Sequence, residues 1–215
     1  SWIVLAVLAV QVILGGLTVL KLLAFWTVTL HLVFGNLFCL LLLTMTLRCR
    51  EAMSPVTTAS ASSNANRRLV FAGAILLFAQ MVVGGLVSSN HAGVACLQWP
   101  TCQGDVWFPT FSGLIGLHLA HRLIAYTLSA ITLWIAISAR TDERLKKPAF
   151  IALGFVAIQV ILGVLNVVWY LPVEVTALHS AFAAALVLIY TVLFREALRD
   201  HSQQDTDLNR AMGAA

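Results

Sequence analysis

Charged side chains are scarce in this sequence. Lys, Arg, Asp and Glu together make up 10% of its 215 residues, whereas hydrophobic residues make up 60%. A folded domain whose surface faces water carries about 25% charged residues, so this composition excludes a soluble globular protein. The sequence instead predicts a polytopic membrane protein that lies in the lipid bilayer.

The start of the chain lacks the marks of a signal peptide. It has no initiator Met, no basic segment before the apolar run and no small-residue cleavage site, and a secretory signal needs the last two. The chain therefore enters its first span at Trp2. We expect that residues upstream of Trp2 are missing from this sequence.

Long apolar runs account for most of the chain. At 1.5 Å per residue, a helix needs about 20 apolar residues to cross a hydrocarbon core of ~30 Å. Six runs have about this length, at residues 2–19, 25–47, 69–88, 112–138, 149–169 and 173–194. We expect an all-α bundle of six transmembrane helices, which leaves no room for a separate soluble domain.

Basic residues indicate the orientation of the bundle. Eleven of the 13 Lys and Arg residues lie between spans two and three, between spans four and five, or in the tail. Because Lys and Arg near span ends stay in the cytoplasm, we expect both chain ends there and residues 89–111 on the periplasmic side of a bacterial inner membrane. This topology accounts for the net charge of +4, so we expect no nucleic-acid partner.

Polar segments divide the chain. Residues 51–67 are small, polar and without hydrophobic period, which is typical of a flexible linker. Residues 197–215 have the same character and are expected to form a cytoplasmic tail. Between these segments, residues 68–196 predict a complete four-helix bundle, whereas residues 1–50 hold only two helices.

One stretch of sequence occurs twice, 148 residues apart. Residues 11–31 and 159–179 are identical at 10 of 21 positions without a gap, and a Gln, a Gly and a final His keep the same spacing in both. This predicts a duplicated unit in which His31 and His179 are equivalent. Two helices would then be missing before the first copy, and the intact protein would have about eight.

Four histidines fall within or at the top of the predicted spans: His31, His118, His121 and His179. An imidazole in hydrocarbon is costly unless it is paired, hydrated or coordinated, so each is a candidate functional residue. A hydrogen bond across a helix interface is the simpler alternative. At matched depth on two helices of one bundle, His121 and His179 suit the two axial positions of a haem iron. The sequence has neither the clustered thiols typical of zinc sites nor the Met row typical of copper transport.

Arg122 is the only basic residue within a span. A buried guanidinium needs an anion or other acceptors, so either a haem propionate or neighbouring backbone carbonyls would stabilise it. His118 lies one helical turn from His121 on the same face. Spacing alone leaves His118 open as an alternative ligand, a propionate contact or a proton carrier.

Cys96 and Cys102 stand in the loop expected outside the membrane. An oxidising compartment permits a disulfide between them, which would act either as a structural staple or as a redox-active pair. Cys39 and Cys49 are expected to be free thiols.

Several of these motifs together resemble heme A synthase. They are Gly84-Gly85 with Asn90, the loop Cys96-Leu-Gln-Trp-Pro-Thr-Cys102, the group His118-x2-His121-Arg122, and Gln159-x3-Gly163 with His179. They match the second half of that family, and the copy that ends in His31 is similar to the close of its first half.

The resemblance implies a fold of two pseudo-symmetric four-helix bundles and a membrane oxidoreductase that converts the C8 methyl of heme O into the formyl group of heme A. It implies that His121 and His179 ligate a resident haem b that relays electrons, and that His31 lies on the heme O side. Candidate partners are heme O synthase, cytochrome oxidase assembly factors and a second copy of the chain.

The sequence departs from the family at two points. The catalytic glutamate and the histidine that would oppose His31 belong to an upstream helix that this sequence does not contain, so its catalytic residue is unknown. Leu97-Gln98 stands where the family has Pro-Asp. We therefore expect one full haem site and half of another. The alternatives are a bis-histidine b-type cytochrome that only carries electrons, or a transporter or chaperone with pore-lining histidines.

Overall fold

The computed structural model describes residues 2–53 and 63–213, and within these ranges the chain forms six long α-helices and one short 3-10 helix. The helices are α1 (Trp2–Leu20), α2 (Phe25–Met53), α3 (Asn64–Ser89), η1 (Ala92–Ala95), α4 (Gly113–Ser138), α5 (Lys146–Val168) and α6 (Val173–Gly213). All six α-helices are long and apolar enough to cross a membrane. The expected all-α membrane fold is confirmed, and the chain is a multi-pass membrane protein.

Two helix boundaries differ from the expected ones. Helix α2 extends to Met53 and α3 begins at Asn64, so the interval between the helices is shorter than 51–67, and most of it lies outside the described residues. Helix α6 continues to Gly213, well past the expected start of the tail. From Val173 onward no Pro or Gly occurs before Gly213, so no helix-breaking residue ends α6 at the edge of its apolar segment.

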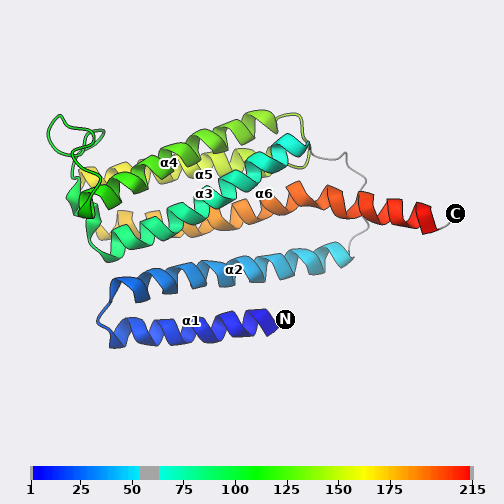
Figure 1. Ribbon diagram of the computed structural model, residues 1–215, viewed down its shortest axis with the longest axis horizontal. Coiled ribbons are helices and arrows are strands. Elements are labelled where there is room, and N and C mark those ends of the chain that lie inside the picture. Colours follow the sequence, from blue (N-terminus) through cyan, green and yellow to red (C-terminus); the bar gives the residue numbers. More distant parts are fainter. Residues whose placement is uncertain (1, 54–62, 214–215) are drawn as a thin grey trace.

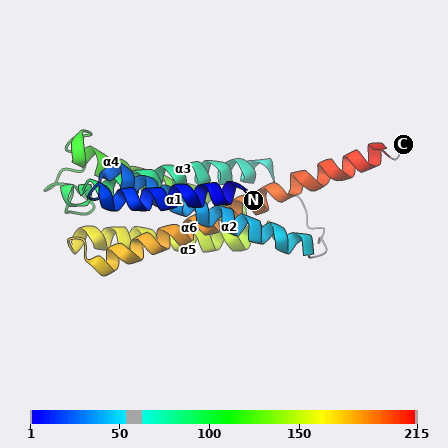
Figure 2. The same cartoon turned by 90° about the horizontal axis from the view of Figure 1, so that it is seen from below.

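The helices form a four-helix group with a hairpin beside it. Helices α3 to α6 make up the group, and the α1–α2 hairpin packs along it through α2, which contacts both α3 and α6 (Figure 1). The turned view separates the α3–α4 and α5–α6 hairpins, with α1–α2 overlapping the space between them (Figure 2). The end that carries the loop between α3 and α4 is called the loop end here, and the opposite one the linker end.

Apolar packing is concentrated toward the linker end of the four-helix group. Its buried side chains come mainly from the first halves of α3 and α5, the second half of α4 and the middle of α6, and include Val70, Ile135, Ala149, Ala152 and Leu193. The alanines let the helix backbones approach closely, as is common in membrane bundles. The loop-end half is therefore where the bundle accommodates polar side chains.

The duplication seen in the sequence is repeated in the backbone. Leu22 and Leu23 in the α1–α2 turn have φ angles of 49° and 62°, and Tyr170 and Leu171 in the α5–α6 turn have 58° and 59°. Positive φ is uncommon for bulky residues, so two such pairs separated by 148 residues indicate one inherited turn. Equivalent backbone hydrogen bonds accompany it: Leu22 N to Val19 O and Tyr170 N to Val167 O, Leu23 N to Thr18 O and Leu171 N to Asn166 O.

Polar contacts fix the α1–α2 hairpin to the four-helix group near both ends. Toward the linker end, Nη2 of Arg195 lies 2.7 Å from Oε2 of Glu51, and its Nη1 donates to the carbonyl of Thr44 at 3.2 Å. Toward the loop end, the hydroxyls of Thr29 and Ser89 are 3.2 Å apart. The hairpin is thus attached to α6 and α3 by side chains as well as by the chain itself.

Candidate functional site

Three of the four intramembrane histidines rest against a glycine of the neighbouring helix. The histidine lies on the second helix of a hairpin and the glycine on the first. A Cβ atom placed on Gly84 would lie 3.0 Å from Cε1 of His121. The same distance is 3.1 Å from Gly15 to His31 and 3.5 Å from Gly163 to His179. Glycine thus leaves space for each imidazole ring close to the neighbouring backbone.

A glutamine stands four residues before each of these glycines. The amide Nε2 of Gln80 lies 3.3 Å from Nε2 of His121. In the α1–α2 hairpin, Nε2 of Gln11 lies 3.5 Å from Nε2 of His31. Since an amide nitrogen can only donate, the histidine Nε2 is the acceptor in both contacts.

Gln159 uses the same amide differently. Its Nε2 donates to the backbone carbonyl of His179 at 2.8 Å, so it holds the peptide of that residue rather than its ring. The bond nevertheless connects α5 to α6 at the position of the histidine. Each hairpin therefore pairs a glutamine with its histidine, twice through the ring and once through the backbone.

Six buried side-chain polar atoms in the described part of the chain have no hydrogen-bond partner. They are Nδ1 of His31, His121 and His179, and Oε1 of Gln11, Gln80 and Gln159. Leaving a buried polar group unpaired costs about 1–3 kcal/mol, and such groups are rare in native proteins. Because they are confined to three equivalent Gln-Gly-His sets, these sets are the candidate functional site of the bundle.

His121 and His179 belong to the same four-helix group and lie in its loop-end half. His31 lies in the α1–α2 hairpin, outside this group. The two histidines that the sequence predicted as a pair thus lie on α4 and α6 of one four-helix group, and their pairing across a ligand stays a prediction.

His118 and Arg122 are engaged with the loop between α3 and α4. Nδ1 of His118 lies 3.0 Å from the carbonyl of Ala92, and its Nε2 accepts from Nε of Arg122 at 3.3 Å. The guanidinium also donates to three loop carbonyls: Thr101 at 3.0 Å, Cys96 at 3.0 Å and Gln98 at 2.8 Å. Four of its five N–H groups are therefore used. Of the two roles left open for Arg122, these contacts correspond to the binding of neighbouring carbonyls.

The loop is closed by a disulfide at its base. Cys96 and Cys102 are bonded, with their Cα atoms 4.5 Å apart, and both are buried beside Leu119. Cys39 and Cys49 are free and exposed. Arg122 binds the carbonyl of Cys96 and those of two residues between the cysteines. The disulfide and the guanidinium therefore restrain the same segment of the loop, residues 96–102.

We expect Cys96 and Cys102 to resist alkylation by an impermeant thiol reagent until the protein is reduced. The test uses a variant in which Cys39 and Cys49 are serine, so that only the loop cysteines can react. Mass spectrometry should show no label before reduction and two labels after it. Labelling of both thiols in the unreduced protein would contradict the disulfide.

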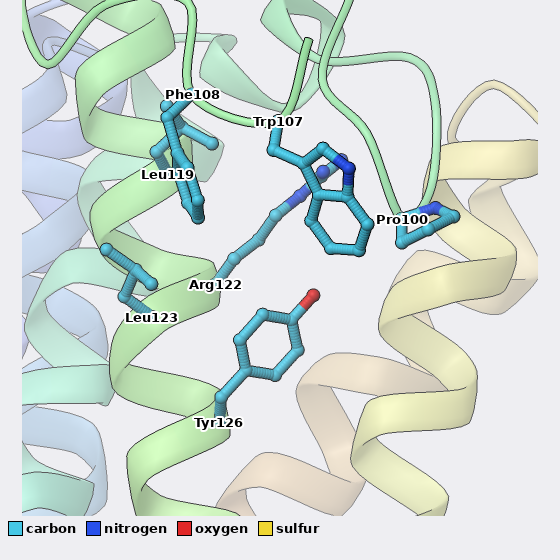
Figure 3. A pocket seen from close by; sticks show the side chains of 7 residues that line it. All are labelled: Pro100, Trp107, Phe108, Leu119, Arg122, Leu123 and Tyr126. Carbon is cyan, nitrogen blue, oxygen red and sulfur yellow. The ribbon is translucent and has the colours of Figure 1, made fainter. Parts of the chain in front are cut away.

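A cavity of about 310 Å³ lies between this loop and α4. Figure 3 shows Pro100 and Trp107 of the loop above it, Tyr126 below, and the Arg122 side chain ending behind Trp107. At 3.6 residues per turn, His121 is on nearly the opposite face of α4 from the residues that line the cavity. The cavity and the histidine pair are therefore separated by the helix itself.

Gln80 and Gly84 are candidate site residues that the sequence reasoning missed. The signal was present, because they repeat the Gln-x3-Gly spacing of the other two sets. His121 follows Gln80 by 41 residues, whereas the corresponding interval is 20 residues for His31 and Gln11. The long loop between α3 and α4 causes this difference, so a comparison without gaps does not align the third set.

Comparisons with known proteins place similar sequences beside this chain. Residues 1–191 match the sequence model of the COX15-CtaA family, described as cytochrome oxidase assembly protein. A protein of Shewanella oneidensis named heme A synthase is 31% identical over 198 residues, which cover 77% of this chain and 59% of that protein.

Two further relatives carry the same name. The heme A synthase of Beijerinckia indica is 32% identical over 191 residues, covering 79% of this chain and 51% of the relative. That of Caulobacter sp. strain K31 is 33% identical over 137 residues, covering 57% of this chain and 39% of the relative. The chain thus spans between 39% and 59% of the length of the three relatives it matches.

Proposed function

Because the chain belongs to the COX15-CtaA family of cytochrome oxidase assembly proteins, we propose that it performs part of the reaction of heme A synthase. In that reaction the C8 methyl of heme O becomes the formyl group of heme A, a four-electron oxidation that takes one oxygen atom from O2 or water. The observation that carries the proposal is the pair of intramembrane histidines, His121 and His179, in one four-helix group.

The residues of this group fit a haem b. Both are imidazoles near the loop end of their helices, and Gly84 and Gly163 leave space beside their rings. Each ring also keeps a buried nitrogen for which the protein supplies no partner, which is unusual for a side chain with a purely structural role. His121 and His179 would therefore hold a resident haem b through a ring nitrogen each, and that haem would supply one-electron transfer.

The surrounding residues support this site from the loop end. His118 and Arg122 fix the loop over α4 through their bonds to backbone carbonyls. One N–H of Arg122 remains for a haem propionate. In this proposal His118 and Arg122 hold the loop, and the propionate contact expected from the sequence is an additional role.

His31 is proposed to bind heme O, the substrate. It occupies the position in the α1–α2 hairpin that His179 occupies in α5–α6. Gly15 lies beside its ring as Gly163 lies beside the ring of His179, whereas Gln11 contacts the ring of His31 itself. The resemblance places the opposing histidine and the catalytic glutamate on a helix that precedes α1. The described helices thus contribute one ligand to the substrate side and two to the cofactor side.

Location and partners follow from the same proposal. The chain would lie in a bacterial inner membrane with the linker end in the cytoplasm and the loop end in the periplasm, because the basic residues gather at the linker end. Heme O synthase, cytochrome oxidase assembly factors and a second copy of the chain are the proposed partners.

The activity is tested in the complete protein, in membranes that contain heme O. We expect heme A to accumulate, as detected by extraction and chromatography of the haems, and His31→Ala to abolish its formation while the haem b spectrum persists. A protein that keeps a reducible bis-imidazole haem but forms no heme A would instead be an electron-carrying cytochrome. Absence of any haem would favour the transporter or chaperone.

A further inference from the structure

Gln80 and Gln11 touch the one atom of each histidine that haem iron would need. Iron bound by a neutral imidazole takes the lone pair of the ring nitrogen that carries no proton. In both hairpins that atom is Nε2, and the glutamine amide already donates to it, at 3.3 Å on His121 and 3.5 Å on His31. An amide N–H and an iron ion cannot share one lone pair.

The other polar atoms of each glutamine–histidine pair are consistent with Nε2 binding either the amide or the iron, but not both. With the amide on Nε2, the only unpaired atoms are Nδ1 of the histidine and Oε1 of the glutamine. Without the amide, Nε2 of His121 would be unpaired as well, at a further cost to the haem-free protein. The amide of Gln80 therefore has a distinct function while no haem is bound, because it supplies a hydrogen bond to the ligating nitrogen of His121.

We propose that the side-chain amides of Gln80 and Gln11 compete with haem iron for the ligating nitrogen of their histidines. Each amide donates a hydrogen bond to that nitrogen when haem is absent and releases the nitrogen when haem binds. This inference rests on the proposed function, since it takes His121 and His31 as iron ligands. Both glutamines are positioning residues, because they act on the histidines and not on the reacting atoms. Their effect is to weaken haem binding and to ease haem release.

Release matters most at His31. A resident haem can remain bound through many turnovers, whereas substrate heme O must enter and product heme A must leave. A site whose histidine regains a hydrogen bond on release loses haem at a smaller free-energy cost than one whose histidine is left bare. Gln11 thus supports exchange on the substrate side.

Gln159 provides a matched control within the same chain. It occupies the equivalent position on α5, yet it donates to the backbone carbonyl of His179 and not to the ring. It does not compete with iron for the lone pair of its histidine. Removing its amide should affect stability without making haem bind more tightly.

The test compares Gln80→Met with Gln159→Met, since Met has a similar length but no N–H donor. Haem affinity of the purified protein is measured by competition with a haem-scavenging apoprotein, and stability of the haem-free protein by thermal unfolding. A hydrogen bond worth about 1 kcal/mol predicts that Gln80→Met binds haem roughly five-fold more tightly. Its haem-free form should unfold at a lower temperature, and Gln159→Met should show no gain in haem affinity, because its amide does not contact the ring of His179.

Each outcome decides between the possibilities. Equal or weaker haem binding in Gln80→Met would overturn the inference, as would an equal gain in Gln159→Met. Should Gln80→Met fail to fold, Gln80→Asn keeps the amide but shortens its reach, and it should also bind haem more tightly. If the unsubstituted protein shows no bis-imidazole haem spectrum, the proposed function itself fails. If it shows that spectrum and Gln80→Met does not change the haem affinity, only the inference about the glutamines fails.

Discussion

His121→Ala and His179→Ala should each abolish the low-spin haem spectrum of the purified protein. A low-spin bis-imidazole haem needs both axial ligands, so the loss of either leaves at most a five-coordinate, high-spin haem. The measurement is the reduced-minus-oxidised absorption spectrum, together with the haem content per protein. We expect the sharp α band to disappear entirely in both variants.

His91→Ala is the control for this experiment. His91 is exposed in the loop between α3 and α4, so its removal should leave the spectrum unchanged. His31→Ala should also keep the low-spin haem, because His31 lies in the other hairpin. The ligand assignment is wrong if His121→Ala and His179→Ala both retain the full low-spin signal.

Arg122→Met should produce the largest loss of stability among single substitutions in the loop region. The change removes the donors of three loop carbonyls and of His118. With a cost of about 1–3 kcal/mol for each buried acceptor left unpaired, we expect a loss of at least ~3 kcal/mol. Thermal unfolding in detergent measures this loss, and chymotrypsin, which cleaves after Trp and Phe, should cut the loop after Trp107.

Arg140→Met serves as the matched control, because Arg140 is exposed beyond the end of α4. It should leave both unfolding and cleavage unchanged. Arg122→Lys should have an intermediate effect, since an ammonium group cannot reach the same set of carbonyls as a planar guanidinium. An Arg122→Met protein with a protected loop and unchanged stability would show that the guanidinium does not hold the loop.

The helices could be predicted from the sequence because hydrocarbon imposes a minimum length on each apolar run. The predicted span 112–138 and the observed α4 (Gly113–Ser138) differ by one residue at the start. The extent of α6 could not be predicted in this way. Past its apolar segment the helix continues through polar residues, where hydropathy indicates only that the chain has left the membrane.

The sequence predicts those parts of the site that depend on distinctive side chains. His121 and His179 stand out because an imidazole is costly in hydrocarbon. The partners of Arg122 could not be found in the sequence, because they are backbone carbonyls, which every residue has, and only the fold brings Cys96 and Thr101 to the guanidinium. Gln80 was hidden by the length of a loop, which changes the spacing along the chain but not in space.

The pairing of glutamine and histidine within a single hairpin also bears on how the protein is made. A polytopic chain enters the bilayer in pieces, and an unpaired imidazole or carboxamide opposes the transfer of its helix into lipid. Gln11 and His31 reach each other within α1 and α2, as Gln80 and His121 do within α3 and α4. Each of these two hairpins thus carries the partner for its own histidine ring, so we expect it to leave the translocon as a unit, before its neighbours have been synthesised.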